Sequence, residues 1–232
     1  YYIFMIPAFL LMFLTQMYVK SAFKKWSHVP NERKMSGTEA VQRLIRAAGL
    51  SHIDTDYGQG QGLRIQQIGG QLSDHYDPRT KTLRLSPAVS QGRSVASLAI
   101  AAHELGHAQQ DAEEYFPLKL RGAMVPMVNI GSWLGWIMIF GGILLNAANL
   151  SWLGVIVFSS GALFALATLP VEFDASARAK RLLTDTGIIS TEQEQRGVNS
   201  VLNAAALTYV AALVTAVMQI LYFSSMIGGR RR

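Results

Sequence analysis

The motif His103-Glu104-Leu105-Gly106-His107 contains the residue types that zinc-dependent hydrolysis needs, at a suitable spacing. In a helix, residues i and i+4 lie on one face, so both histidines can direct an imidazole nitrogen to one metal ion at about 2.1 Å. Glu104 follows the first histidine and lies beside the metal without having to bind it. A carboxylate there can take a proton from a water molecule that the metal polarises. The motif therefore predicts a catalytic zinc site with Glu104 as general base.

The composition limits what can surround this site. Half of the 232 residues are hydrophobic, so long apolar segments must be concentrated somewhere in the chain. Cysteine is absent, which leaves His, Asp, Glu and water as metal ligands. The formal net charge is +6, but the basic residues are scattered or flank apolar runs and form no basic patch with interleaved aromatic residues. We therefore expect these charges to face a lipid bilayer and not a nucleic acid.

Four uncharged apolar segments are long enough to cross a membrane as helices. The expected transmembrane helices are 1–19, 124–145, 150–169 and 201–223. Only Asn146–Asn149 separates the second from the third, so these two predict a transmembrane hairpin, and its glycines would let the helices approach closely. Pro170 is expected to end the third span.

The segment 20–121 is polar and holds all five histidines, which predicts a water-soluble domain. Three elements are expected in it: a helix over 37–48, a β-hairpin over 72–85, and a helix over about 93–112 that contains the motif. Ser36 and Glu39 form a capping box for the first helix, and 52–68 is expected to be a mobile loop between short strands. The hairpin could pair with an extended substrate backbone, or it could simply cover the motif helix.

A catalytic zinc site needs a third protein ligand. No histidine follows His107, so a downstream ligand must be a carboxylate. Asp111 lies eight residues after His103, about 12 Å along a helix, which is too far for both to bind one ion. Glu172 follows the membrane hairpin, which returns the chain to the side it left. It would stand in the first turn of a new helix within a polar segment at 170–200, where the helix dipole favours a carboxylate. Three upstream histidines remain alternative candidates for the third ligand: His28, His52 and His75.

Basic residues flank the apolar segments on one face of the membrane. They follow the first span, precede the second and follow the third: Lys20, Lys24, Lys25, Lys119, Arg121, Arg178, Lys180 and Arg181. The positive-inside rule makes that face cytoplasmic, so the motif and Glu172 are expected to face the cytosol. The triplet Arg230–Arg232 conflicts with this orientation because four full spans place it outside.

Three blocks of the sequence are distinctive: SDHYDPRTKTLRLSP (73–87), GRSVASLAIAAHELGHAQQ (92–110) and PVEFDASARA (170–179). Together they resemble the YugP-like family of bacterial membrane-bound neutral zinc metallopeptidases, over nearly the whole chain. The resemblance implies one zinc ion per chain, bound by His103, His107 and Glu172, with Glu104 as catalytic base, in the bacterial cytoplasmic membrane. The layout is also similar to the HtpX and CAAX-prenyl peptidases, in which an E-x-x-A-D block follows a membrane hairpin. Ser176 stands here where that group has aspartate.

These observations predict a mainly α membrane protein with about four transmembrane helices and a cytosolic α+β zincin-like domain that contains the motif helix and a β-hairpin. The expected function is that of a membrane-embedded zinc endopeptidase with a gluzincin-like ligand set, acting on cytosol-facing segments of membrane proteins. Five further residues are candidates to support the metal or to stabilise the oxyanion: Ser176, Asp174, Arg178, His75 and Tyr76.

Two other functions are consistent with the same residues. One is a non-catalytic membrane scaffold that keeps zinc for structure, and the other is zinc-dependent hydrolysis of a substrate that is not a peptide. The sequence contains no Walker A motif, so ATP-driven unfolding of substrates is not expected. Glycine-rich membrane faces leave a homo-oligomer or a partner membrane protein open.

Overall fold

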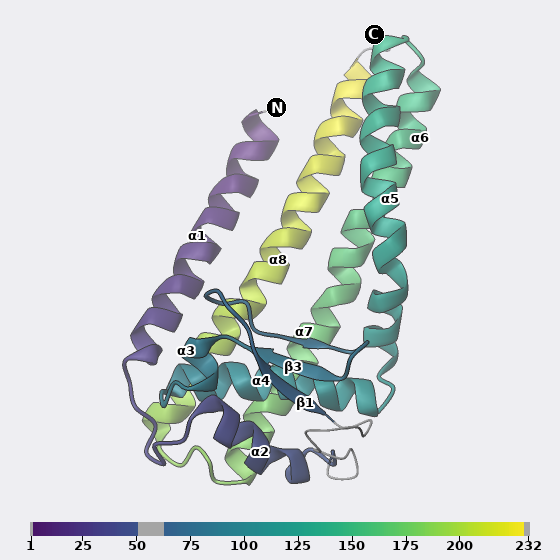
Figure 1. Cartoon of the computed structure of the whole chain (residues 1–232). Helices are drawn as coiled ribbons and strands as arrows, with labels where there is room; N and C mark the ends of the chain where they lie inside the picture. Colours follow the sequence, from purple (N-terminus) through teal and green to yellow (C-terminus); the bar gives the residue numbers. More distant parts are fainter. Residues whose placement is uncertain (1, 51–62, 230–232) are drawn as a thin grey trace. The chain divides into compact units, whose positions relative to one another are not determined.

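The computed structural model of the chain describes residues 2–50 and 63–229, and helices dominate it (Figure 1). In chain order this part holds α1 (Tyr2–Ser27), α2 (Gly37–Ala47), β1 (Arg64–Gln67), β2 (His75–Asp77), β3 (Thr82–Leu85), α3 (Pro87–Ser90), α4 (Val95–Ala112), α5 (Phe116–Leu144), α6 (Ala148–Phe158), α7 (Ser160–Asp185) and α8 (Glu192–Gly229). Most of the expected loop at 52–68, His52 included, and the triplet Arg230–Arg232 lie outside the described residues.

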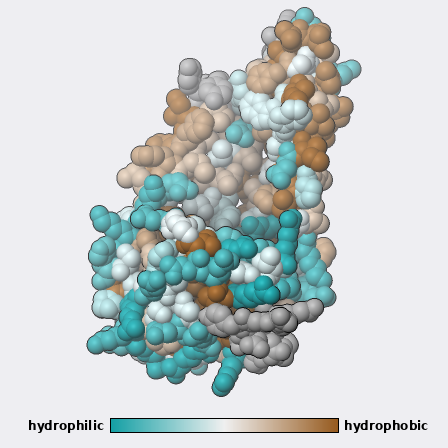
Figure 2. All heavy atoms as spheres, in the orientation of Figure 1, coloured by the Kyte–Doolittle hydropathy of each residue, from teal (hydrophilic) through white to brown (hydrophobic). Residues whose placement is uncertain are grey.

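The chain forms two compact units. The apolar unit comprises Tyr1–Met17, Phe116–Pro170 and Leu207–Arg232, and the polar unit comprises Tyr18–Tyr115 and Val171–Ala206. Hydrophobic residues gather on the visible surface of the apolar unit, and hydrophilic residues on that of the polar unit (Figure 2). The motif and Glu172 both belong to the polar unit, so the candidate site lies within one unit.

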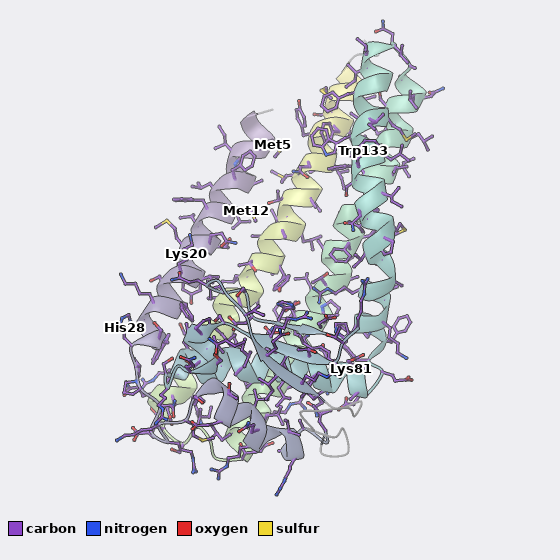
Figure 3. The ribbon with its side chains drawn as sticks, viewed as in Figure 1. Met5, Met12, Lys20, His28, Lys81 and Trp133 are labelled. Atoms are coloured by element: carbon purple, nitrogen blue, oxygen red, sulfur yellow. The ribbon has the colours of Figure 1, made fainter. Side chains whose placement is uncertain are left out.

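Four helical segments of the described chain are long and apolar enough to cross a membrane. They are Met5–Ser27, Phe116–Leu144, Ala148–Asp185 and Glu192–Gly229. Their large apolar side chains stay exposed, as Phe13 (61%) and Trp133 (70%) do. Met5, Met12 and Lys20 follow one another along α1, and Trp133 lies on α5 (Figure 3). The prediction of about four membrane spans agrees with these segments, and the chain is a multi-pass membrane protein.

The helices α5 and α6 form the expected hairpin. The short connection between them contains Asn146, whose backbone is left-handed with φ 52°. Glycine allows the two helices to come close together. A Cβ on Gly135 would stand 2.8 Å from the Cβ of Phe158, and a Cβ on Gly154 would stand 2.6 Å from the backbone nitrogen of Ile139. Gly135 and Gly154 therefore serve the close packing that was predicted for the hairpin glycines, whereas a Cβ on Gly141 would meet nothing within 4 Å.

The predicted helix break at Pro170, with a new helix opening after it, is wrong. The helix α7 continues through Pro170 to Asp185, and the irregularity lies earlier, at Ser159, whose hydroxyl donates to the Val155 carbonyl at 2.7 Å. Proline removes one backbone donor, whereas a helix end there would leave several backbone groups without helical partners. Glu172 therefore does not stand in the first turn of a helix, and the helix dipole that was expected to favour its carboxylate does not act there.

Three other helices begin or end at residues that differ from the predicted ones. The helix α5 begins at Phe116 and not at 124, because Pro117 lies in its first turn, where a missing N–H costs no helical hydrogen bond. The helix α8 begins at Glu192 and not at 201, since the Thr191 hydroxyl accepts a hydrogen bond from the Glu194 backbone nitrogen at 3.2 Å and caps the helix. The helix α1 runs past residue 19, with two lysines in its last turn, where cations are favoured.

In the polar unit, α2 has the predicted capping box. The Ser36 hydroxyl accepts from the Glu39 backbone nitrogen at 3.2 Å, and the Glu39 carboxylate accepts from the Ser36 backbone nitrogen at 2.7 Å. The strands form one sheet in the order β1-β3-β2, in which β3 is antiparallel to β2 and parallel to β1. The β2–β3 hairpin was predicted, whereas the parallel partner β1 was not.

The apolar first half of α4 is buried in the core of the polar unit. This core joins side chains of α4, α2, β3 and α7, among them Leu98, Leu44, Leu83 and Leu183. Because one end of α4 is held in this way, the motif in its second half has a defined position.

Candidate metal centre

The motif lies on a capped and buried helix. The Ser94 hydroxyl accepts a hydrogen bond from the Ser97 backbone nitrogen at 3.1 Å, which satisfies one of the free N–H groups at the start of α4. One turn apart on this helix, the rings of His103 and His107 lie with their centroids 4.8 Å from each other. The sequence spacing therefore produces the shared face that was expected for the two histidines.

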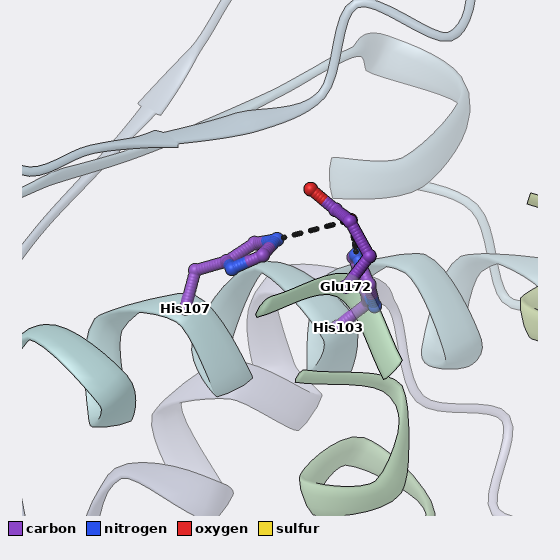
Figure 4. A group of neighbouring side chains, drawn as sticks. All are labelled: His103, His107 and Glu172. Carbon is purple, nitrogen blue, oxygen red and sulfur yellow. Dashed lines mark hydrogen bonds and ion pairs between the residues drawn. The ribbon is translucent and has the colours of Figure 1, made fainter. Parts of the chain in front are cut away.

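Glu172 of α7 meets both histidines (Figure 4). Its Oε2 lies 3.3 Å from Nε2 of His103 and 3.6 Å from Nε2 of His107. One ligand atom from each of the three residues lies within 4.8 Å of the others, and among the described residues this is the group of acidic and imidazole side chains that could hold a metal ion. Ligands about 2.1 Å from a tetrahedral zinc lie roughly 3.4 Å apart, so the separations suit one ion.

The second nitrogen of each imidazole has a partner of its own. The Nδ1 of His103 lies 3.2 Å from the Ser176 hydroxyl, and the Nδ1 of His107 lies 3.0 Å from Oε1 of Gln110. With Nδ1 engaged, Nε2 of each ring is the nitrogen directed at Glu172 and available to a metal. Metal-binding histidines are usually held in this way.

Burial and charge in the cluster favour a cation. The side chains of His103, His107 and Glu172 are 12%, 11% and 3% exposed. Burial lowers the pKa of His107, but its hydrogen bond to Glu172 and the negative charges of Glu104 and Glu172 outweigh burial and hold that pKa above its ordinary value. The same negative charges favour a divalent cation between the three ligand atoms.

Glu104 is buried close to the histidines but is not a member of the three-residue group. Its Oε2 accepts a hydrogen bond from the backbone nitrogen of Tyr76 at 2.9 Å. Because β2 is an edge strand, this N–H can face α4 instead of a neighbouring strand. The hydrogen bond orients the Glu104 carboxylate, and the sequence had offered no sign of it.

His28, His75 and Tyr76 have different surroundings. His28 lies at the end of α1, with its Nδ1 2.6 Å from the Lys24 carbonyl oxygen (Figure 3), and His75 is exposed. Neither belongs to the metal-ligand group, so these two do not substitute for Glu172. The Tyr76 hydroxyl donates to Asp111 at 2.6 Å, and burial together with this hydrogen bond raises the pKa of Tyr76.

Gln110 is a site residue that the sequence reasoning missed. Its side chain is fully buried and connects His107 of α4 to Val171 and Asp174 of α7. Its position three residues after His107, on the same face of the helix, was the available signal. Asp174, which was predicted as a supporting residue, is thus connected to the candidate ligand His107 through the side chain of Gln110. Arg178, also predicted, donates to Asp174 at 2.5 Å and to Glu113 at 2.7 Å.

Close approach of α4 and α7 depends on Gly106. A Cβ at this position would stand 2.7 Å from the carbonyl oxygen of Ala175 and 3.2 Å from its Cα. Any side chain at Gly106 would therefore push apart the two helices that carry the histidines and Glu172.

Four candidate membrane spans and a buried His-His-Glu group define a multi-pass membrane protein with a candidate metal centre in its polar unit. The family model described as "Putative neutral zinc metallopeptidase" matches residues 1–228, and the chain belongs to this family of zinc metallopeptidases. It is 41% identical, over 218 residues, to the "Putative membrane protease YugP" of Bacillus subtilis (strain 168), an alignment that covers 94% of this chain and 92% of that protein. No solved structure matches the chain. The resemblance to the YugP-like family is confirmed, while the similarity to the HtpX and CAAX-prenyl peptidases stays a prediction.

Proposed function

We propose that the chain is a gluzincin-type zinc endopeptidase in which His103, His107 and Glu172 hold one zinc ion and Glu104 is the general base. The observation that carries this proposal is the convergence of three ligand atoms, from α4 and α7, to within 4.8 Å of one another. Membership of a zinc metallopeptidase family supports the same class of activity.

The residues around this centre suit peptide hydrolysis. Zinc, when bound, supplies Lewis-acid polarisation of a water molecule and of the peptide carbonyl. Glu104 takes the proton of the attacking water and passes it to the leaving amine. Its carboxylate is free for this task because it is not one of the three ligands, and the N–H of Tyr76 holds it in orientation. The motif helix beside the edge strand β2 supports a zincin-like arrangement.

The proposed substrates are cytosol-facing segments of membrane proteins. Glu172 lies two residues after Pro170 in a helix whose earlier residues, 160–169, carry no charge, so the ligand set is close in sequence to a membrane span. The basic residues around the spans favour the cytosolic face for the polar unit. The membrane concerned is proposed to be the bacterial cytoplasmic membrane, and the similarity to the membrane protease YugP of Bacillus subtilis supports this proposal.

The mechanism is tested with the full chain purified in detergent, by measuring its zinc content and its cleavage of casein. We expect about one zinc per chain in the wild type and in Glu104→Gln, with cleavage by the variant reduced by at least ~100-fold. Glu172→Ala should lose zinc. Unchanged cleavage in Glu104→Gln would refute the mechanism. A wild-type protein that binds zinc but cleaves nothing would favour the alternative of a non-catalytic, zinc-bearing scaffold. Analysis of the reaction products shows whether the bond that is cleaved is a peptide bond.

The orientation of the chain in the membrane is tested by cysteine labelling in intact cells. Because the sequence contains no cysteine, each introduced thiol is the one that reacts. Arg79→Cys places a thiol in the exposed β2–β3 turn, Asn146→Cys places one between α5 and α6, and Gly229→Cys places one at the end of α8. We expect a membrane-impermeant reagent to label positions 146 and 229 but not 79. A protected thiol at 229 would contradict four full spans.

A further inference from the structure

Gln110 is a fully buried polar residue beside the metal-ligand group. Burying an amide costs free energy unless the amide is hydrogen-bonded, and the contacts of Gln110 meet that condition. Its Nε2 lies 2.8 Å from the Val171 carbonyl oxygen and 2.8 Å from Oδ2 of Asp174, and its Oε1 lies 3.0 Å from Nδ1 of His107.

These contacts determine which way the amide faces. The Val171 carbonyl oxygen and the Asp174 carboxylate can only accept hydrogen bonds, so the NH₂ group must face them. The amide oxygen then faces His107, and because an amide oxygen can only accept, Nδ1 of His107 must carry the proton. With the proton on Nδ1, the Nε2 atom that lies 3.6 Å from Glu172 is the nitrogen that can give its lone pair to a metal ion.

The same side chain also connects the two helices that supply the ligands. Gln110 belongs to α4, three residues after His107, while Val171 and Asp174 lie on either side of Glu172 in α7. The two bonds to α7 span 61 and 64 residues of sequence. One amide therefore sets the tautomer of His107 and holds the segment that carries Glu172.

His103 is held differently. Its Nδ1 contacts the Ser176 hydroxyl at 3.2 Å, and a hydroxyl can either donate or accept. Ser176 therefore positions the His103 ring without selecting its tautomer. Of the two side chains that contact an Nδ1 atom, Ser176 and Gln110, Gln110 is the one whose chemistry dictates where the proton lies.

We propose that Gln110 is a positioning residue for the metal centre, which fixes the metal-binding tautomer of His107 and couples it to the segment Val171–Asp174. This inference rests on the proposed zinc site. Glutamine suits the position because it combines one acceptor with two donors. Glutamate there would bring a carboxylate against the Asp174 carboxylate and the Val171 carbonyl, and methionine would leave all three partners without the amide that they share.

The test compares zinc affinity in the detergent-purified full chain, by competition with a chromophoric chelator, for the wild type, Gln110→Met, Gln110→Glu and the double variant Gln110→Glu/Asp174→Asn. The matched control is Gln109→Met, at the partly exposed neighbouring glutamine of α4. We expect Gln110→Met to lower zinc affinity by about 10- to 100-fold and Gln109→Met to leave it unchanged. The absorption spectrum of the cobalt-substituted protein should change in Gln110→Met.

The double variant separates positioning from general damage. The carboxylate introduced by Gln110→Glu has no hydrogen to donate to its two partners on α7, so this single variant should bind zinc weakly. The amide introduced by Asp174→Asn can donate to that carboxylate, so the double variant should recover at least about tenfold in zinc affinity. Wild-type affinity and an unchanged cobalt spectrum in Gln110→Met would overturn the inference, as would a double variant no better than Gln110→Glu. If the wild type itself binds no zinc, the proposed function fails before this inference is reached.

Discussion

Replacing Gly106 by alanine tests how closely α4 and α7 must approach for the metal centre to form. The new Cβ would stand 2.7 Å from the Ala175 carbonyl oxygen, whereas ordinary van der Waals contact begins at 3.4 Å. The helices must therefore separate locally by about 0.7 Å, while metal–ligand distances tolerate only about 0.2 Å. Gly106 lies between the two histidines, and Ala175 lies three residues after Glu172, so the displacement acts directly on the ligands.

Stability and metal affinity should respond differently to this change. Overpacking costs about 1–3 kcal/mol, and alanine in a helix interior regains about 1 kcal/mol relative to glycine. The free energy of unfolding of the metal-free protein should thus fall by at most about 2 kcal/mol. Zinc affinity should fall at least tenfold, which is about 1.4 kcal/mol.

Chelator competition and thermal melting of the detergent-purified chain measure the two quantities. Gly122→Ala in α5 is the matched control, because a Cβ there would meet nothing within 4 Å. It should gain helix propensity and bind zinc as the wild type does. A Gly106→Ala variant with wild-type zinc affinity would show that close approach at this glycine does not position the ligands.

Three further predictions address the polar unit. Ser36→Ala removes the acceptor of the α2 capping box and should lower the free energy of unfolding by about 1 kcal/mol in thermal melting, with zinc affinity unchanged; a loss of zinc would contradict a purely local role. Tyr76→Phe should lose about 1 kcal/mol of stability and keep its kcat, because the hydroxyl is bonded to Asp111; a fall of about 100-fold in kcat would instead assign that hydroxyl to the oxyanion. Burial raises the pKa of Asp77, but hydrogen bonds from Arg84, a threonine hydroxyl and a backbone N–H outweigh burial and lower that pKa from 3.8 to about 2. A folded pKa below the unfolded value means that this stabilisation is present above about pH 4 and is lost as the pH falls through about 2, so urea titrations of Asp77→Asn should show a weaker loss of stability over that range.

Features set by neighbouring residues were predictable from the sequence. The i, i+4 spacing of His103 and His107 placed both rings on one face of α4. The capping box of Ser36 and Glu39 placed the start of α2, and the turn after Tyr76 placed the β2–β3 hairpin. Each of these depends on bonds between residues a few positions apart, which the order of residue types specifies directly.

Features that depend on residues far apart in the chain were harder to predict from the sequence. Pro170 is a helix breaker by its local chemistry, yet α7 continues through it to Asp185, because proline removes only one backbone donor. The supporting role of Gln110 was missed because two of its three bonds reach residues more than 60 positions away. The parallel pairing of β1 with β3 was missed for the same reason, since it joins strands that no turn connects.

The sequence alone determined the two histidines, the adjacent glutamate and the apolar segments, because helical periodicity and hydropathy are local properties. It also narrowed the third ligand to Glu172 or an upstream histidine. Only the tertiary structure decided which of the described candidates meets His103 and His107, with Glu172 Oε2 3.3 Å and 3.6 Å from their Nε2 atoms across 69 and 65 residues of chain. That meeting depends on the close packing of α4 against α7 at Gly106 and on the amide of Gln110, and such packing exists only after the chain has folded.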